Sequence, residues 1–308
     1  MYGTLASLSL LFGGIALLLP VLKSRWQTDG ANTDGAIRNV VWDSDVNLSS
    51  AIADVINGGV PTIIQNHGRK WRAFEKWQNE FYLQNHVHQF DNVKEGNKIF
   101  NEDPKRSLTP FLVQGQMHPP VVHDNMTVRQ FFDSVDNGRH LYYLGALQEE
   151  FAPLATDMSM WQALTEPTSP PDDVLAYVWL ASVGISVQLH YDLSHNFHAM
   201  VRGCKRFTFL PPKEHTNLYL YPNAHPAFRK SQVYWRQDSI DVRRFPQFAN
   251  VDDALEVELG PGQVRISTRM VRMSCYGTAF TTCSAADDLH SAAVVSLGVH
   301  TFMWRTQQ

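Results

Sequence analysis

The chain has 308 residues, of which 44% are apolar and 18% are charged. This composition is typical of a globular protein with one large domain or two small ones, and the net charge of −4 gives no indication of a nucleic-acid partner. The three cysteines, Cys204, Cys275 and Cys283, are too few and too widely spaced for a disulfide framework or a zinc cluster, so we interpret them as thiols.

The N-terminus carries an uncharged apolar run from Leu5 to Leu22, followed at once by Lys23 and Arg25. A run of this length is at the lower limit for a membrane-spanning helix. A secretory signal fits less well, because no positive charge precedes the run. We therefore expect residues 1–25 to form an uncleaved single-pass membrane anchor, with the two cations placing the rest of the chain on the cytoplasmic side.

The localisation has an alternative. The triplets Asn47-Leu48-Ser49 and Asn125-Met126-Thr127 are sequons, at which glycans are attached in the secretory pathway. A small-x-small site at Gly14 and Ala16 also allows signal cleavage, although apolar residues would follow the cut. The second possibility is therefore a protein of the secretory-pathway lumen, released after signal cleavage.

Behind the anchor, residues 26–40 are polar and contain several Gly, Asn and Asp residues, which predicts a linker. A β-branched run over residues 60–66 predicts a strand. Apolar residues at helical spacing predict three helices, and Thr127 is the expected N-cap of the third. These predicted helices cover residues 47–59, 71–86 and 126–135.

From residue 140 onward, short strands and turns dominate the sequence. The segments expected to contain strands are residues 140–147, 173–192, 197–212 and 254–266. Many short strands separated by Gly and Pro turns, after a helical first half, predict a mainly β domain with N-terminal helices packed outside a β-barrel or sandwich.

The stretch QLHYDLSHN, residues 188–196, carries the candidate metal ligands. On a strand, His190 and Asp192 would project from one face and Tyr191 from the other. An imidazole and a carboxylate on one face are two of the three ligands of a 2-His-1-carboxylate triad, which leaves positions on Fe(II) open for a cosubstrate and O₂. Because an H-x-D pair is also common as an ordinary polar pair, the surrounding sequence has to decide.

That surrounding sequence resembles the JmjC/cupin-like family of Fe(II)- and 2-oxoglutarate-dependent oxygenases, most closely the branch of the asparaginyl hydroxylase that inhibits hypoxia-inducible factor. The likeness is an ordered series of matches: VWLASVG, HYDLSHNF, VRGCKRFTFLPP, LYLYPNAHPAFRKSQV, RRFPQF and VELGPGQV. It extends over residues 40–264, with a return at VVSLGVHTF. The resemblance implies a double-stranded β-helix (jelly-roll, cupin type) over residues 41–303, anomalous over 265–288.

The resemblance also implies roles for residues around the motif. Lys205 matches the lysine that binds the distal carboxylate of 2-oxoglutarate, and Asn196 matches a pocket asparagine that hydrogen-bonds the cosubstrate or a metal-bound water. Tyr142 resembles the tyrosine that donates to the same carboxylate, although its neighbour Tyr143 leaves the register open. Trp179, His195 and His198 match no ligand position and are expected to pack.

Two departures from the family pattern affect the site. Three positions before the first ligand, a threonine that helps to hold 2-oxoglutarate is replaced by Val187, and one lost hydrogen bond costs on the order of 1 kcal/mol. After GPGQV the family continues with an apolar strand, Pro, aromatic residues and the distal histidine ligand. This chain has Met273 near that position, and His290 and His300 follow in contexts that do not match.

The codons offer an explanation for the missing histidine. Met270-Val271 must be encoded ATG GTN, which reads TGG, tryptophan, one nucleotide later. With a TCN codon at Ser267, the same shift gives Pro-Pro-x-Trp, which is the missing family pattern. Two interpretations follow: a reading-frame or splice error over residues 265–288, or true divergence to an inactive form.

The function that the sequence predicts is an Fe(II)- and 2-oxoglutarate-dependent dioxygenase that uses O₂ to hydroxylate a side chain of a protein or peptide. The metal ligands would be His190 and Asp192, with His290 as one candidate for the third. The alternative is a catalytically inactive, membrane-tethered cupin-like binding module. Incomplete ligation favours that alternative, whereas the joint presence of both ligands with Asn196 and Lys205 argues against it.

Overall fold

A computed structural model of the chain describes most of the region that the sequence predicts to be folded. The described residues are 38–41, 52–53, 55–56, 60–96, 98–99, 122–158, 174–223, 225–233, 241–252, 254–267, 277–283 and 293–301.

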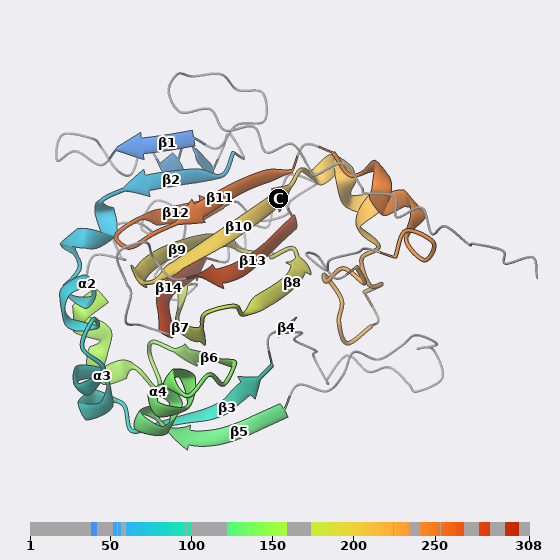
Figure 1. The fold of residues 1–308 in the computed structure, drawn as a ribbon. Coiled ribbons are helices and arrows are strands. Elements are labelled where there is room, and N and C mark those ends of the chain that lie inside the picture. Colours follow the sequence, from blue (N-terminus) through green and yellow to red (C-terminus); the bar gives the residue numbers. More distant parts are fainter. Residues whose placement is uncertain are drawn as a thin grey trace, which may run out of the picture.

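Two sheets build the domain (Figure 1). The larger sheet has nine strands in the order β1-β2-β12-β9-β14-β7-β6-β3-β5, and the smaller has five in the order β11-β10-β13-β8-β4. Among the described strand pairs, all are antiparallel except β1–β2 and β4–β8. This is the mainly β, cupin-type jelly roll that the sequence predicts, and the prediction of the fold class is confirmed.

The strands of the larger sheet are β1 Arg38–Val41, β2 Thr62–Gln65, β3 Gln89–Glu95, β5 Val122–Thr127, β6 Leu141–Ala146, β7 Val174–Ser182, β9 His195–Arg202, β12 Val264–Ser267 and β14 Ala293–Thr301. Those of the smaller sheet are β4 Lys98–Ile99, β8 Ser186–His190, β10 Cys204–Leu210, β11 Leu255–Leu259 and β13 Gly277–Cys283. The helices with described bounds are η1 His67–Lys70, α2 Arg72–Lys76, α3 Glu80–His86, α4 Val128–Asp136, η3 Ala152–Met158, η5 Pro212–Leu218 and η6 Pro246–Asn250.

The helices follow the predicted caps, with one break. Thr127 caps α4 through a reciprocal box, in which its hydroxyl accepts from the Gln130 amide and the Gln130 side chain accepts from the Thr127 amide. The single helix predicted over residues 71–86 is instead α2 and α3. Asn79 starts α3, because its side chain accepts a hydrogen bond from the Phe81 amide at 2.9 Å.

The prediction of a helical first half was wrong, because β3 and β5 extend the larger sheet there. In β3 the two fully buried residues, Phe90 and Val93, are three apart, and the β3–β5 register shifts between them. A bulge of this kind breaks the alternation that identifies a strand and leaves a spacing that resembles a helix. At the other end of the sheet, β1 starts at Arg38, inside the segment expected to be a linker.

The two faces of the larger sheet have different roles. Its outer face packs against α2, α3 and α4, which lie together on one side of the molecule (Figure 1). Strand β9 shows the alternation: Phe197, Ala199 and Val201 belong to this helix-covered core, whereas His198 contacts a ring on β10 and Met200 packs with residues of the smaller sheet. The inner face therefore lines the space between the sheets.

Cys204 is not a free thiol, which corrects the interpretation of the cysteines. It is disulfide-bonded, and the β10–β13 register aligns it with Cys283. The alignment of the two positions depends on an antiparallel ladder between segments far apart in sequence, which spacing alone does not reveal.

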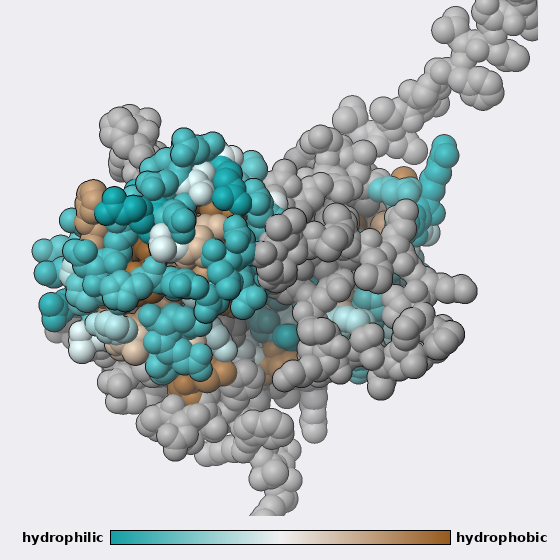
Figure 2. All heavy atoms as spheres, turned by 90° about the horizontal axis from the view of Figure 1, so that it is seen from below, coloured by the Kyte–Doolittle hydropathy of each residue, from teal (hydrophilic) through white to brown (hydrophobic). Residues whose placement is uncertain are grey.

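The described surface seen in Figure 2 is mostly hydrophilic. None of the described helices is long and apolar enough to cross a bilayer. The predicted anchor, Leu5 to Leu22, lies outside the described residues.

Candidate metal and anion site

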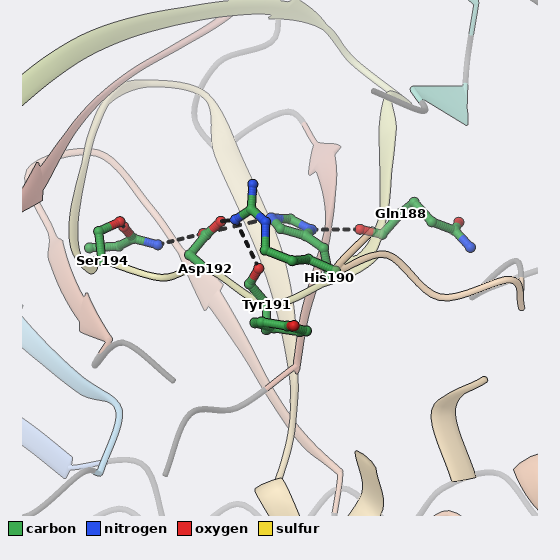
Figure 3. A network of polar contacts seen from close by, with 7 residues as sticks. Gln188, His190, Tyr191, Asp192 and Ser194 are labelled. Atoms are coloured by element: carbon green, nitrogen blue, oxygen red, sulfur yellow. Dashed lines mark hydrogen bonds and ion pairs between the residues drawn. The ribbon is translucent and has the colours of Figure 1, made fainter. Parts of the chain in front are cut away.

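His190 and Asp192 face each other at the end of β8. His190 is the last residue of the strand, so Asp192 lies just beyond it and not within it as expected. The His190 Nδ1–H donates to the Gln188 carbonyl at 2.7 Å, and Nε2 lies 3.8 Å from Asp192 Oδ2 (Figure 3). The carbonyl bond fixes the ring so that Nε2 and the carboxylate point to one place, which is how metal-binding histidines are commonly oriented.

Two further side chains hold the Asp192 carboxylate. The Asn196 amide donates to Oδ2 at 2.6 Å, and the Arg229 guanidinium donates to Oδ1 at 3.3 Å. Asn196 is fixed in turn by Ser194, whose hydroxyl donates to its Oδ1 at 3.1 Å. The asparagine singled out from the sequence is thus a direct partner of the aspartate.

Arg229 is a site residue that the sequence interpretation missed. Its backbone has φ of 69°, in the left-handed region that a non-glycine residue rarely adopts. Backbone bonds hold it there, because the Tyr191 amide donates to the Arg229 carbonyl and the Ser231 amide donates to the Leu189 carbonyl. Strained backbone of this kind often marks a functional site. The sequence gives no sign of it at Arg229, because the backbone angle is known only from the structure.

Lys205 lies on β10 and is 1% exposed. Its Nζ donates to the Ser296 hydroxyl on β14 at 2.7 Å and lies 5.6 Å from the centre of the Trp179 ring. Burial holds the pKa of this lysine well below its ordinary value, and the nearby Arg265 guanidinium adds to the effect. Trp179 packs against a buried cluster, as expected, and its ring also lies beside this lysine.

The structure separates the two neighbouring tyrosines. Tyr143 stacks on Phe90, with ring centres 4.1 Å apart, in the helix-covered core. Tyr142 faces inward beside Val187 and Trp179, and it is fully buried, which raises the pKa of its hydroxyl. Tyr142 is thus the tyrosine on the pocket side, next to the valine that replaces the family's threonine.

A third metal ligand does not appear among the described residues, which contain no cluster of three or more metal-binding side chains. Strand β13 pairs with β8 and places Thr278 opposite His190. His300 pairs with Asn196 on the other sheet, and both His290 and Met273 lie outside the described residues. In the described part of the chain, the register position facing the first ligand therefore carries a threonine.

The fold and the polar end of β8 define the chain as a cupin-type β-barrel protein. Its sequence matches the cupin-like domain family over residues 49–264, more than half of the 308-residue chain. The chain therefore belongs to the cupin-like domain family.

The residues present fit a divalent metal and a dicarboxylate. His190 and Asp192 supply an imidazole nitrogen and a carboxylate, the donor types that Fe(II) accepts in this class of site. Lys205 supplies a buried cation and Tyr142 a buried hydroxyl, as a distal carboxylate requires. The metal end has two of its three expected donors in the described residues, and the two groups expected to bind the distal carboxylate, Lys205 and Tyr142, are both buried.

Proposed function

We propose that this protein is an Fe(II)- and 2-oxoglutarate-dependent dioxygenase that hydroxylates a side chain of a protein or peptide. The observation that carries the proposal is the combination, inside one barrel, of the His190–Asp192 pair and the buried Lys205. Membership of the cupin-like domain family is compatible with this chemistry. The sequence motifs favour the asparaginyl hydroxylase branch of the family.

At the metal end, His190 and Asp192 would hold Fe(II), which supplies the activation of O₂ that couples 2-oxoglutarate decarboxylation to hydroxylation of a C–H bond. The hydrogen bonds from Asn196 and Arg229 go to different oxygens of the Asp192 carboxylate, Oδ2 and Oδ1, and restrict its rotation. The Gln188 carbonyl does the same for the imidazole. These contacts orient the two donors before a ligand arrives.

At the other end, Lys205 would bind the distal carboxylate of 2-oxoglutarate. Its ammonium is desolvated, so an arriving carboxylate gains a charge-assisted bond in a place where water does not compete. Tyr142 would donate its hydroxyl proton to the same carboxylate, because its raised pKa keeps it protonated at neutral pH. Val187 cannot contribute the hydrogen bond that a threonine would give.

The test is turnover of 2-oxoglutarate by the full-length chain with Fe(II) and ascorbate, measured as succinate formed. Because only two of the three expected donors are among the described residues, we expect turnover barely above background in the unaltered protein and a gain in Thr278→His. Adding His190→Ala to Thr278→His should abolish that gain, whereas adding His88→Ala, which changes an exposed histidine, should leave it unchanged. Equal turnover in Thr278→His with and without His190→Ala would refute the assignment of the metal end.

We also propose that the N-terminal run anchors the protein in a membrane, with the barrel on the lumenal side and not on the cytoplasmic side expected from Lys23 and Arg25. The disulfide at Cys204 supports this side, because disulfides persist mainly in oxidising compartments. The sequon residue Asn125 is exposed on β5 and accessible to a glycan. A mobility shift on glycosidase treatment, lost in Asn125→Gln, supports the lumenal side, and an unglycosylated protein with a reduced Cys204 contradicts it.

A further inference from the structure

Arg265 is a second buried cation inside the barrel. It lies on β12 and is 4% exposed. Its neighbours Val264 and Ile266 pack into the helix-covered core on the outer face of the sheet. Because side chains alternate along a strand, Arg265 points to the inner face, and its ring contact with Phe207 of the smaller sheet agrees with this direction.

The Arg265 guanidinium stacks on two aromatic rings. Its Cζ lies 4.2 Å from the centre of the Phe207 ring and 5.4 Å from that of Phe209. Stacking uses the face of the guanidinium, whereas its N–H groups point outward in the plane. Within the described residues, the buried Nε and Nη1 have no hydrogen-bond partner. A buried charged group with unused donors is costly unless a ligand satisfies it.

Arg265 lies between the two ends of the candidate site. It pairs with His198 on β9, one pleat or about 7 Å along the strand from Asn196, the partner of the metal-binding aspartate. Ser296, the partner of the buried lysine, pairs with Met200, one pleat further in the same direction. Measured along β9, Arg265 therefore lies at a level between the partner of the aspartate and the partner of the lysine.

The electrostatics agree with this position. Burial lowers the pKa of Arg265 to about 10, while the charge of Asp192 opposes the shift. The same guanidinium contributes to the lowered pKa of Lys205. Two cations thus share a desolvated interior, and Asp192, the acidic group that acts on Arg265, also binds Arg229. An anion with two negative charges would relieve their repulsion.

We propose that Arg265 and Lys205 together form a two-cation site for a small dicarboxylate, and that this site holds the acid without a bound metal. The inference deepens the proposed function and rests on it in so far as Lys205 belongs to the same pocket. The free Nε–H of Arg265 donates to one carboxylate, and the Lys205 ammonium binds the other. Arg265 thereby gives the pocket an affinity for the acid that does not depend on the third metal ligand.

The test measures binding to the full-length chain in excess EDTA by calorimetry. The probes are glutarate, a dicarboxylate that lacks the metal-chelating keto group, and pentanoate, a monocarboxylate with the same chain length. We expect glutarate to bind at least tenfold more tightly than pentanoate. Arg265→Met should weaken glutarate binding at least tenfold. Arg206→Met, which changes an exposed arginine paired with Glu258, should leave it within twofold. Unchanged glutarate affinity in folded Arg265→Met overturns the proposal.

A second arm does not depend on the folding of that variant. In Lys205→Met, Arg265 is the remaining cation, so glutarate and pentanoate should bind with affinities within threefold of each other. If Lys205→Met binds neither acid at millimolar concentration, Arg265 is not a ligand-binding residue and the inference fails. Glutarate binding that depends on Arg265, in a protein without 2-oxoglutarate turnover, upholds the inference while the proposed reaction fails. If the protein turns over 2-oxoglutarate and Arg265→Met binds glutarate with unchanged affinity, the proposed reaction stands and the inference about Arg265 fails.

Discussion

Replacement of Lys205 by methionine should separate ligand binding from stability. The side chain is 1% exposed and burial holds its pKa well below the ordinary value, so the folded protein carries the cost of desolvating an ammonium. Methionine fills a similar volume without a charge and loses one hydrogen bond, from Nζ to Ser296 Oγ at 2.7 Å. We therefore expect the ligand-free variant to melt at the same temperature as the unaltered protein or higher.

The effect of the same substitution on 2-oxoglutarate binding should be large and unfavourable, in contrast to its effect on the melting temperature. Two unit charges 4 Å apart interact by about 4 kcal/mol at an effective dielectric constant of about 20. The net value of a hydrogen bond to a charged group is smaller, about 1.5–3 kcal/mol, because both partners lose hydration. Lys205→Met should accordingly weaken 2-oxoglutarate binding roughly ten- to hundredfold.

The assay is anaerobic calorimetry with Mn(II) in place of iron, with thermal melting measured on the same samples. Lys213→Met, which changes an exposed lysine on η5, is the matched control and should change neither quantity. Unchanged 2-oxoglutarate affinity removes Lys205 from the site. A parallel drop in melting temperature would show that the lysine is structural and that its charge does not oppose folding.

Three further predictions concern other parts of the molecule. Asn196→Ala removes the 2.6 Å hydrogen bond to Asp192 and should weaken Fe(II) binding at least tenfold in an anaerobic titration, whereas an unchanged affinity would show that the bond does not orient the ligand. Thr278→His places an imidazole at the register position opposite the first ligand and should tighten Fe(II) binding at least tenfold; no gain would show that β13 does not supply the third ligand. Burial, with a smaller effect of a nearby lysine, lowers the pKa of His67 from 6.5 to about 4. The unfolded chain therefore takes up a proton first as the pH falls, and the free energy of unfolding should drop by up to about 3 kcal/mol between pH 6.5 and 4. In denaturant titrations His67→Leu should flatten this slope, and an equal slope in both proteins would contradict the assignment.

Much of the fold could be predicted from local patterns. The sequence segments that form β7 to β12 are rich in β-branched and aromatic residues, and turns with Gly or Pro separate them. The order and type of these elements can therefore be predicted from the sequence. The cap of α4 is equally local, because Thr127 and Gln130 are three residues apart. The predictions that were wrong concern features that depend on tertiary structure. A bulge breaks the alternation of buried residues in β3, and Cys204 is aligned with Cys283 only by the pairing of β10 with β13.

The candidate site divides in the same way. His190, Asp192, Asn196 and Lys205 stand in an ordered motif, and the structure places them in one barrel. Arg265 gave no signal, because a charged residue in a strand is ordinarily interpreted as facing solvent. In the structure neither face of β12 is exposed to solvent, because helices cover one face and the second sheet covers the other. This burial follows from tertiary packing and cannot be inferred from the strand alone.

The departure from the family pattern after residue 264 affects the third metal ligand more than it affects the pairing of the barrel strands. Strand β12 stays in register with β9 through Ser267, and β13 pairs with both β8 and β10 from Gly277 onward. The described strands within the anomalous segment, the end of β12 and β13, thus still belong to the two sheets, while the position opposite His190 carries a threonine. True divergence leaves the anion end, with Lys205 and Arg265, as it is, whereas a reading-frame error over residues 265–288 would include Arg265 and leave only Lys205 unchanged. At the metal end, the shifted frame restores the Pro-Pro-x-Trp pattern but does not place a histidine directly after the aromatic residues. Thr278→His is designed to supply that donor, and metal-free glutarate binding measures what the chain retains without it.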